Sequence, residues 1–378
     1  MAAAALPDTD FVSLCSPRFE TEDLRVCAVE DTADRKWLVT CPLTEHSDLQ
    51  LQIQSQIMEA LSHDGARLPF CLPWPAHTVR IVGGKHALVH PAFPGRPARS
   101  EDLTVSDKLA ASLGGALAAL HDLPARVLQA ADRPAFTADQ IRRRWLSLLD
   151  EAASTQAIPP RLWQRWEERL EDISLWRFAS AFIHADLQEA YLYIEDETIT
   201  GITGFGQARF GDPARDLAWV VSSSSDEFAR ELLAQYHQLR LYEDPKLSAR
   251  IELNSELVLL EWLMHGVREN NESIIADARE LISQLADTLD STGLLPALRE
   301  NSGLEDPPEG KESEQDEPQQ EENGQDLEQY PKEHEENETN APEESPASEP
   351  LPADHDSASK NEIDPPAAAE QDGTPSPR

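Results

Sequence analysis

Residues 182–221 constrain the fold of this chain more than any other stretch, because several motifs follow one another there at fixed spacing. An apolar pair leads directly into a tripeptide that runs from His184 to Asp186. Two β-prone runs, 191–195 and 198–203, come next and are separated by two acidic residues. Strand-like runs joined by a two-residue polar turn predict a β-hairpin immediately after the tripeptide.

Two further segments follow the predicted hairpin. Gly204 and Gly206 flank a phenylalanine, and Asp212 stands directly before Pro213. Aspartate is a good N-cap, and proline suits the first helical position. The sequence therefore predicts a helix that begins at Pro213, has Asp212 as its cap and carries Asp216.

This order of motifs resembles the catalytic centre of the protein-kinase-like fold, in its aminoglycoside and macrolide phosphotransferase branch. There a His-x-Asp catalytic loop has a metal-binding Asn five residues after the Asp, and a hairpin separates it from an Asp-x-Gly metal loop. Here Tyr191 stands at the Asn position and Gly204 at the metal-loop Asp position, so both metal ligands are replaced. The resemblance covers about residues 10–295 and implies an α+β, two-lobed protein-kinase-like fold.

The resemblance also implies roles for the residues that remain. Asp186 is the candidate catalytic base, and His184 supports its loop. Asp216 matches the position that holds the catalytic loop from below, which is a structural role. We interpret Asp212 as a helix cap rather than a ligand. His121 stands at a predicted helix end before a proline, which favours a structural role for it.

Other family positions of the nucleotide or catalytic site are altered as well. Thr40 occupies the place of the basic strand residue, and Gln54 replaces the acidic helix residue. Gln188 stands where the family often has His or Asn. No glycine precedes Gly65, so the first strands contain no glycine-rich phosphate loop.

Metal ions and basic groups supply most of the charge stabilisation in phosphoryl transfer. A tyrosine phenol is a poor ligand for a hard cation, and glycine offers no side chain. The resemblance implies ATP as the nucleotide, whereas these substitutions argue against bound Mg²⁺. Rescue would require Glu189, Glu195 or Gln207 to take a ligand position.

Hydrophobic periodicity outlines the two lobes. Residues 1–97 should form the N-lobe, a small antiparallel sheet with one helix at 48–62. Its strands are expected at 24–29, 36–40, 78–83 and 86–90. Residues 98–300 should form a mainly helical C-lobe, with helices from 104, where Thr104 would be the cap, and at 137–155, 160–173, 226–241, 245–268 and 270–290.

Composition changes at the C-terminal end. Residues 301–378 contain 24 acidic and 4 basic residues, and prolines are frequent. Such a segment buries too little apolar surface to offset the entropy of ordering it. We therefore expect a disordered acidic tail, which either keeps the protein in solution or contacts a protein partner.

The rest of the chain is acidic too, with a net charge of −18 over residues 1–300. That acidity argues against nucleic acid as a partner, because phosphate binding needs basic surfaces. The arginine run 142–144 is the main exception, and we interpret it as a solvated helix face. No window of about 18 apolar residues predicts a membrane span. The four cysteines lack zinc or disulfide spacing, so a reducing, cytoplasmic location is expected.

Three functional hypotheses follow. The leading one is a catalytically impaired phosphotransferase, a pseudokinase that acts as a binding or regulatory module for a small molecule or nucleotide in the inter-lobe cleft. The second is an active ATP-dependent phosphotransferase of a small hydroxylated molecule with a rearranged metal site. The third is an interaction scaffold that works through the acidic tail.

Overall fold

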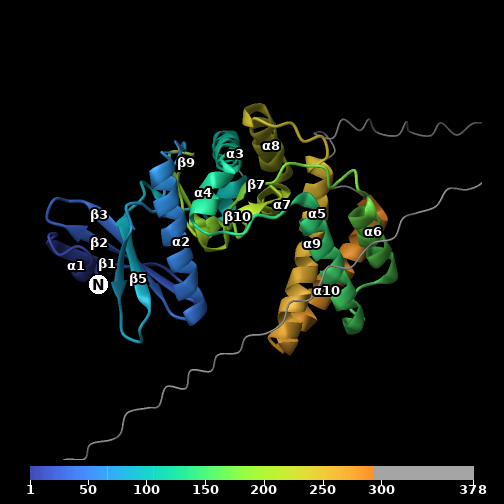
Figure 1. Ribbon diagram of the computed structural model, residues 1–378, viewed down its shortest axis with the longest axis horizontal. Coiled ribbons are helices and arrows are strands. Elements are labelled where there is room, and N and C mark those ends of the chain that lie inside the picture. The colour runs from blue at the N-terminus through green and yellow to red at the C-terminus, as the bar shows by residue number, and fades with distance from the viewer. Residues whose placement is uncertain (66, 105, 293–378) are drawn as a thin grey trace, which may run out of the picture. The chain divides into compact units, whose positions relative to one another are not determined.

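The computed structural model describes residues 1–65, 67–104 and 106–292, and all of them fall within one compact unit of the chain (Figure 1). The predicted acidic tail lies outside the described residues. No helix among these residues is long and apolar enough to cross a membrane. The architecture is mixed: a sheet with one helix is followed by a mainly helical lobe, as the resemblance implied.

The N-lobe sheet is antiparallel and has the strand order β1-β2-β3-β5-β4. Its strands are β1 (Phe11–Glu20), β2 (Leu24–Asp31), β3 (Lys36–Pro42), β4 (His77–Arg80) and β5 (His86–Pro91), and a short helix α1 (Ala2–Ala5) precedes them. The expected strand 78–83 is shorter, because Gly83 and Gly84 have positive φ and form the turn into β5.

The helix α2 (Glu45–Asp64) packs on β3 and β5. Its first turn is a capping box in which the Thr44 hydroxyl accepts from the Ser47 amide, and the Ser47 hydroxyl accepts from the Thr44 amide. Gly65 ends the helix in the left-handed conformation. The buried side chains of α2 include Leu51, Gln54, Ile57, Met58 and Leu61.

The C-lobe is largely helical, as expected. The prediction that Thr104 caps its first helix is wrong. Residues Ser100–Thr104 form a 3₁₀ helix η1, in which the Thr104 hydroxyl donates to the Glu101 carbonyl. Ser106 instead accepts from the Leu109 amide and caps α3. The further helices are α4 (Ala125–Ala130), α5 (Ala138–Ala152), α6 (Pro160–Glu171), α8 (Asp226–Leu239), α9 (Leu247–Arg268) and α10 (Glu272–Thr292), with α3 at Asp107–His121 and a 3₁₀ turn η2 at Ala153–Thr155.

The stretch 182–221 forms the expected hairpin. Its strands are β8 (Leu192–Glu195) and β9 (Thr198–Ile202), and the turn residues Asp196 and Glu197 both have positive φ. β6 (Arg96–Pro97) adds to β8, and β7 (Ala181–Ile183) pairs antiparallel with β10 (Arg209–Gly211). Two 3₁₀ turns flank the hairpin, η3 (Glu189–Tyr191) and η4 (Phe205–Gln207).

The helix after the hairpin, α7 (Ala214–Ser223), begins one residue later than predicted. Pro213, directly before the helix, already has right-handed helical backbone angles, with φ of −60° and ψ of −22°. The Asp212 carboxylate still accepts from the Ala214 amide at 3.0 Å. This is the contact that a capping aspartate makes, so the capping role predicted for Asp212 is supported, although the helix bounds begin at Ala214.

Candidate functional site

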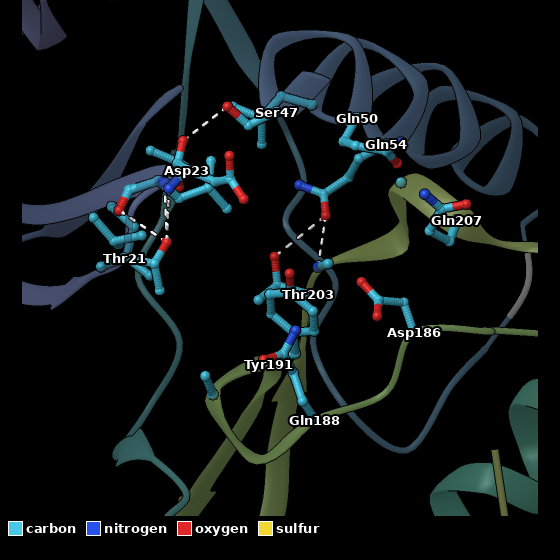
Figure 2. A pocket seen from close by; sticks show the side chains of 18 of the residues that line it. Thr21, Asp23, Ser47, Gln50, Gln54, Asp186, Gln188, Tyr191, Thr203 and Gln207 are labelled. Carbon is cyan, nitrogen blue, oxygen red and sulfur yellow. Dashed lines mark hydrogen bonds between the residues drawn. The ribbon is translucent and has the colours of Figure 1, made fainter. Parts of the chain in front are cut away.

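A cavity of about 320 Å³ lies between the N-lobe sheet, α2 and the central stretch (Figure 2). It brings together predicted site residues from four parts of the chain, and Asp186, Gln188, Tyr191 and Gly204 line one side of it. Thr40 from β3 and Gln54 from α2 also line the cavity. His184, which belongs to the loop that carries Asp186, and Asp216, which hydrogen-bonds to that loop, are also predicted site residues and are both buried.

Asp216 holds the catalytic loop through its backbone. Its carboxylate accepts from the amides of His184 and Ala185, both at 2.8 Å. Ala185 has φ of +69°, a left-handed conformation that is strained for a residue with a side chain. Arg215 donates to the Ala185 carbonyl at 3.0 Å. Hydrogen bonds to the amide and to the carbonyl of Ala185 therefore hold this residue in its strained conformation, directly before Asp186.

A buried network extends from Asp216 to the helices behind it. His121 lies 3.1 Å from the Asp216 carboxylate through Nε2 and 2.8 Å from the Tyr236 hydroxyl through Nδ1. Burial lowers the pKa of His121, so the ring is neutral, donates to Asp216 and accepts from Tyr236. Burial alone would raise the pKa of Asp216, but the hydrogen bond from His121 and the smaller favourable interactions, among them the hydrogen bond from the Ala185 amide, together outweigh it, and the net pKa is lowered. Asp216 is thus ionised, and the position of His121 fits the predicted structural role.

The Asp186 side chain opens into the cavity (Figure 2). Although it reaches solvent, partial burial raises the pKa of its carboxyl, and attraction to His184 and Arg215 offsets the rise only in part. His184 donates through Nε2 to the Thr203 carbonyl at 2.8 Å, and its ring contacts those of Tyr191 and Phe205. The catalytic loop therefore presents one carboxylate to the cavity on a rigid support.

Gln54 binds the backbone of the segment where the family has its metal loop. Its Oε1 accepts from the amides of Gly204 at 2.7 Å and Phe205 at 3.0 Å, and it lies 3.4 Å from the Thr203 hydroxyl (Figure 2). A buried glutamine can accept these bonds without the desolvation cost of a buried carboxylate. Gln54 thus fastens α2 to this segment and is itself only 2% exposed.

Tyr191 packs directly on Gly204. A Cβ atom at residue 204 would lie 2.5 Å from Cδ2, 2.6 Å from Cγ and 2.7 Å from Cε2 of the tyrosine ring. Gly204 also has φ of +86°. The ring therefore occupies the space that a metal-loop side chain would need, and the two substitutions fit each other sterically.

The cavity is acidic and lacks cations. Of the described residues that line it, none is lysine or arginine, whereas Asp23 and Asp186 are both present. Burial raises the pKa of Tyr191 to about 12, and the negative charges of these two aspartates add to the rise. Asp23 lies just after the Thr21 end of the β1–β2 turn, where no glycine occurs.

The residues considered for metal rescue are scattered. Gln207 lines the cavity, but Glu195 lines a different one beside η1, and the Glu189 carboxylate accepts from the Ser100 hydroxyl at 3.2 Å. Within the described part of the chain, no three His, Cys, Asp or Glu residues cluster as a metal site would. Tyr191 and Gly204 themselves offer no carboxylate or amide side-chain oxygen, which are the protein ligands that Mg²⁺ prefers.

One supporting residue was missed by sequence reasoning. Arg250, in α9, is fully buried and pairs with Asp212 at 3.1 Å and with Asp244. Burial raises the pKa of Asp212, and the charge of Arg250 opposes that rise. An arginine within a helix normally lies on the solvent-exposed face. Only the spacing of Arg250 from buried neighbours such as Ile251 could have indicated that it is buried.

His90 lines the same cavity and should make the free energy of unfolding depend on pH. Its ring is 2% exposed and donates from Nδ1 to the Pro91 carbonyl at 2.8 Å. Burial lowers the pKa of His90 to about 4. The unfolded chain therefore binds a proton at His90 more readily than the folded chain does. The folding stability present above about pH 6.5 should fall by about 3 kcal/mol as the pH is lowered toward 4.

His90→Asn keeps a hydrogen-bond donor and should remove this pH-dependent loss of stability in urea denaturation at a series of pH values. The matched control is His46→Asn, because His46 lines the same cavity but is exposed. An unchanged pH profile for His90→Asn would contradict the assignment.

Comparison with known proteins places this geometry in a family. Residues 19–250 match the family described as APH, the phosphotransferase enzyme family. An uncharacterised protein of Bacillus subtilis (strain 168), YcbJ, is 22% identical over 237 residues, which cover 57% of this chain and 72% of that protein.

Solved structures share the fold. The macrolide 2'-phosphotransferase MphH from Brachybacterium faecium, as apoenzyme, is 23% identical with a TM-score of 0.62, and the match covers 74% of this chain and 95% of that one. The GDP and kanamycin complex of APH(2")-IIia is 18% identical with a TM-score of 0.61, over 77% of this chain and 98% of that one. At these identities the likeness establishes the protein-kinase-like fold, and the family match over most of the folded residues shows that this chain belongs to the phosphotransferase enzyme family.

Proposed function

We propose that this chain binds a polar small molecule in its cleft cavity and does not carry out metal-dependent phosphoryl transfer. The contact between Tyr191 and Gly204 carries this proposal, because the ring fills the space of a metal-loop carboxylate. An enzyme of this class needs metal ions to neutralise charge on the transferred phosphoryl group. Because the Tyr191 ring excludes a carboxylate at residue 204, a metal ion has no protein ligand at that position.

The charge of the cavity supports the same reading. Phosphates of a bound nucleotide would face Asp23 and Asp186 with no lysine or arginine among the described lining residues. Like charges at contact distance repel by about 4 kcal/mol at an effective dielectric constant of 20. The wall formed by Val26, Leu38 and Tyr193 is apolar and suits a planar ring. The cavity therefore favours an uncharged ring-bearing molecule over a nucleoside triphosphate.

A second candidate function rests on Asp186. Its carboxylate opens into the cavity, and its pKa is raised, as befits a base that takes a proton from a substrate hydroxyl. An active phosphotransferase of a small hydroxylated molecule would use this group. Solved relatives were crystallised with GDP and kanamycin or with ATP and streptomycin, so the family supplies the precedent. The third hypothesis, a scaffold that works through the acidic tail, concerns residues outside the described part of the chain.

A thermal-shift titration separates these functions. We expect adenosine to stabilise the protein at least as well as ATP, because the triphosphate gains no cationic partner. Addition of Mg²⁺ should leave the ATP-induced change in Tm unaltered. The measurement is Tm against ligand concentration for adenosine, ATP and ATP with Mg²⁺ on the full chain.

Magnesium-dependent stabilisation by ATP would argue for the active enzyme. Phosphate transfer at an ordinary kinase rate, of order 1–100 per second, that Asp186→Ala abolishes would settle the matter against our proposal. Absence of any shift with both nucleoside and nucleotide would favour the scaffold.

A further inference from the structure

A second cavity, of about 250 Å³, lies in the C-lobe beside the β7–β10 ladder. It differs from the cleft cavity in charge, because four arginines line it against two acidic residues. The arginines are Arg144, Arg209, Arg215 and Arg268, and the acids are Asp212 and Glu261. It shares no lining residue with the cleft cavity.

The two acidic residues are already neutralised. Glu261 makes a two-point ion pair with Arg215, with N–O distances of 3.1 and 2.9 Å. Asp212 pairs with Arg250, which does not line the cavity. Arg209 and Arg144 therefore have no ion-pair partner among the described residues that line the cavity.

Arg209 is the most informative residue of the set. It lies on β10 opposite Ile183, and its Nη1 donates to the Gln207 carbonyl at 3.2 Å. In the described part of the chain, no carboxylate lies within ion-pair distance of it. Burial lowers the pKa of Arg209 to about 10, and repulsion from Arg215 adds to the effect. A half-buried guanidinium without an ion-pair partner offers a charge-assisted hydrogen bond to an anionic ligand.

Of the arginine run 142–144, only Arg144 lines this cavity. Arg142 and Arg143 both pair with Asp139 on the same helix, at 3.3 and 2.8 Å, as a solvated face would. Arg144 instead lines the cavity, with its guanidinium 3.9 Å from the centre of the Phe136 ring. The interpretation as a solvated helix face therefore does not extend to Arg144.

Apart from Asn254, the remaining lining of the cavity is apolar. Ile141, Trp145, Leu148 and Ile183 contribute side chains to it. The cavity therefore joins a cationic region made by Arg209 and Arg144 to an apolar wall. A guanidinium matches the planar, two-oxygen geometry of carboxylates and phosphates.

We propose that this cavity binds an oxyanion carried on an apolar body, with Arg209 and Arg144 as its charge partners. The oxyanion occupies the cationic region, and the apolar body packs against Trp145 and Ile141. Phosphate monoesters and aromatic carboxylates share this chemistry. The proposal goes beyond the cleft function and does not depend on it.

Isothermal titration calorimetry on the full chain tests the proposal with three probes. Phenyl phosphate carries both features, inorganic phosphate carries only the anion, and benzylamine carries the ring with a positive charge. We expect phenyl phosphate to bind at least tenfold more tightly than inorganic phosphate, and benzylamine not to bind. Affinity for phenyl phosphate should fall as salt is raised, because the partners are charged.

Variants locate the site. Arg209→Gln should weaken phenyl phosphate binding at least tenfold, and Arg144→Gln should weaken it as well. Arg143→Gln is the matched control, since Arg143 is the neighbouring helix arginine that does not line the cavity. Because Arg144 is exposed, its variant remains informative if Arg209→Gln reduces folding. The proposal is overturned if both variants bind phenyl phosphate as tightly as the parent, or if benzylamine binds equally well. Either result would leave the cleft experiment with adenosine and ATP unaffected.

Discussion

Replacing Asp216 by alanine is expected to lower the free energy of unfolding by on the order of 5 kcal/mol. One carboxylate, 1% exposed, satisfies the amides of His184 and Ala185 and the Nε2–H of His121. Its removal leaves three buried donors unpaired, and each costs about 1–3 kcal/mol. Urea denaturation should show the loss with and without a cleft ligand, because the contacts lie behind the cavity.

A conservative variant makes this prediction sharper. Asp216→Asn keeps one acceptor oxygen but turns the other position into a donor, so its loss of stability should be intermediate. Amide hydrogen exchange at Ala185 should accelerate in both variants, since its strained backbone loses an anchor. An unchanged melting curve for Asp216→Ala, with only ligand binding lost, would instead place Asp216 in the binding site.

Much of the central stretch could be predicted because its determinants are local. The hairpin follows from two β-prone runs and a polar turn, and Asp196 and Glu197 do form that turn. The helices of the C-lobe follow from their apolar spacing. The sequence predicts no strand where β1 lies, because Pro17 and scattered charges interrupt the pattern, and the pairing of β1 with β2 has three register shifts.

Contacts between distant residues explain what the sequence could not reveal. The pairing of Arg250 with Asp212 joins positions 38 residues apart, and it reverses the usual expectation for a helical arginine. Arg209 and Arg144 come from different elements, so their shared cavity has no signature in either segment. Local sequence patterns predict the helices and strands, whereas the packing of these elements determines which charged side chains come into contact.

The alterations at the cleft are correlated rather than independent losses. Gln54 accepts hydrogen bonds from the amides of Gly204 and Phe205, and the Tyr191 ring packs on Gly204. The Tyr191 ring fills the space that a side chain at residue 204 would need, and Gln54 occupies the amides of that segment. The backbone of this segment thus follows the fold of the family, whereas the side chains of Gln54 and Tyr191 pack against it.

That correlation predicts a strong energetic coupling between residues 191 and 204. Gly204→Asp alone should lower the free energy of unfolding by about 4 kcal/mol, because its Cβ would lie within 2.7 Å of three Tyr191 ring atoms and φ is positive. Tyr191→Asn removes the ring. In the double variant the clash is absent, so the combined loss should be smaller than the sum of the single losses by about 2 kcal/mol.

Urea denaturation of the four proteins in this double-mutant cycle measures the coupling. Gly83→Asp is the matched control: Gly83 has φ of +87° but nothing closer than 3.9 Å to an added Cβ, so its variant should lose only about 1 kcal/mol. The double variant also restores an amide and a carboxylate at the two family metal positions, and it should bind ATP more tightly with Mg²⁺ than without. Additive losses in the cycle would show that the ring does not exclude a side chain at 204. Full coupling without any gain in magnesium-dependent binding would mean that the missing basic partner at Thr40, rather than the two ligands, limits nucleotide binding.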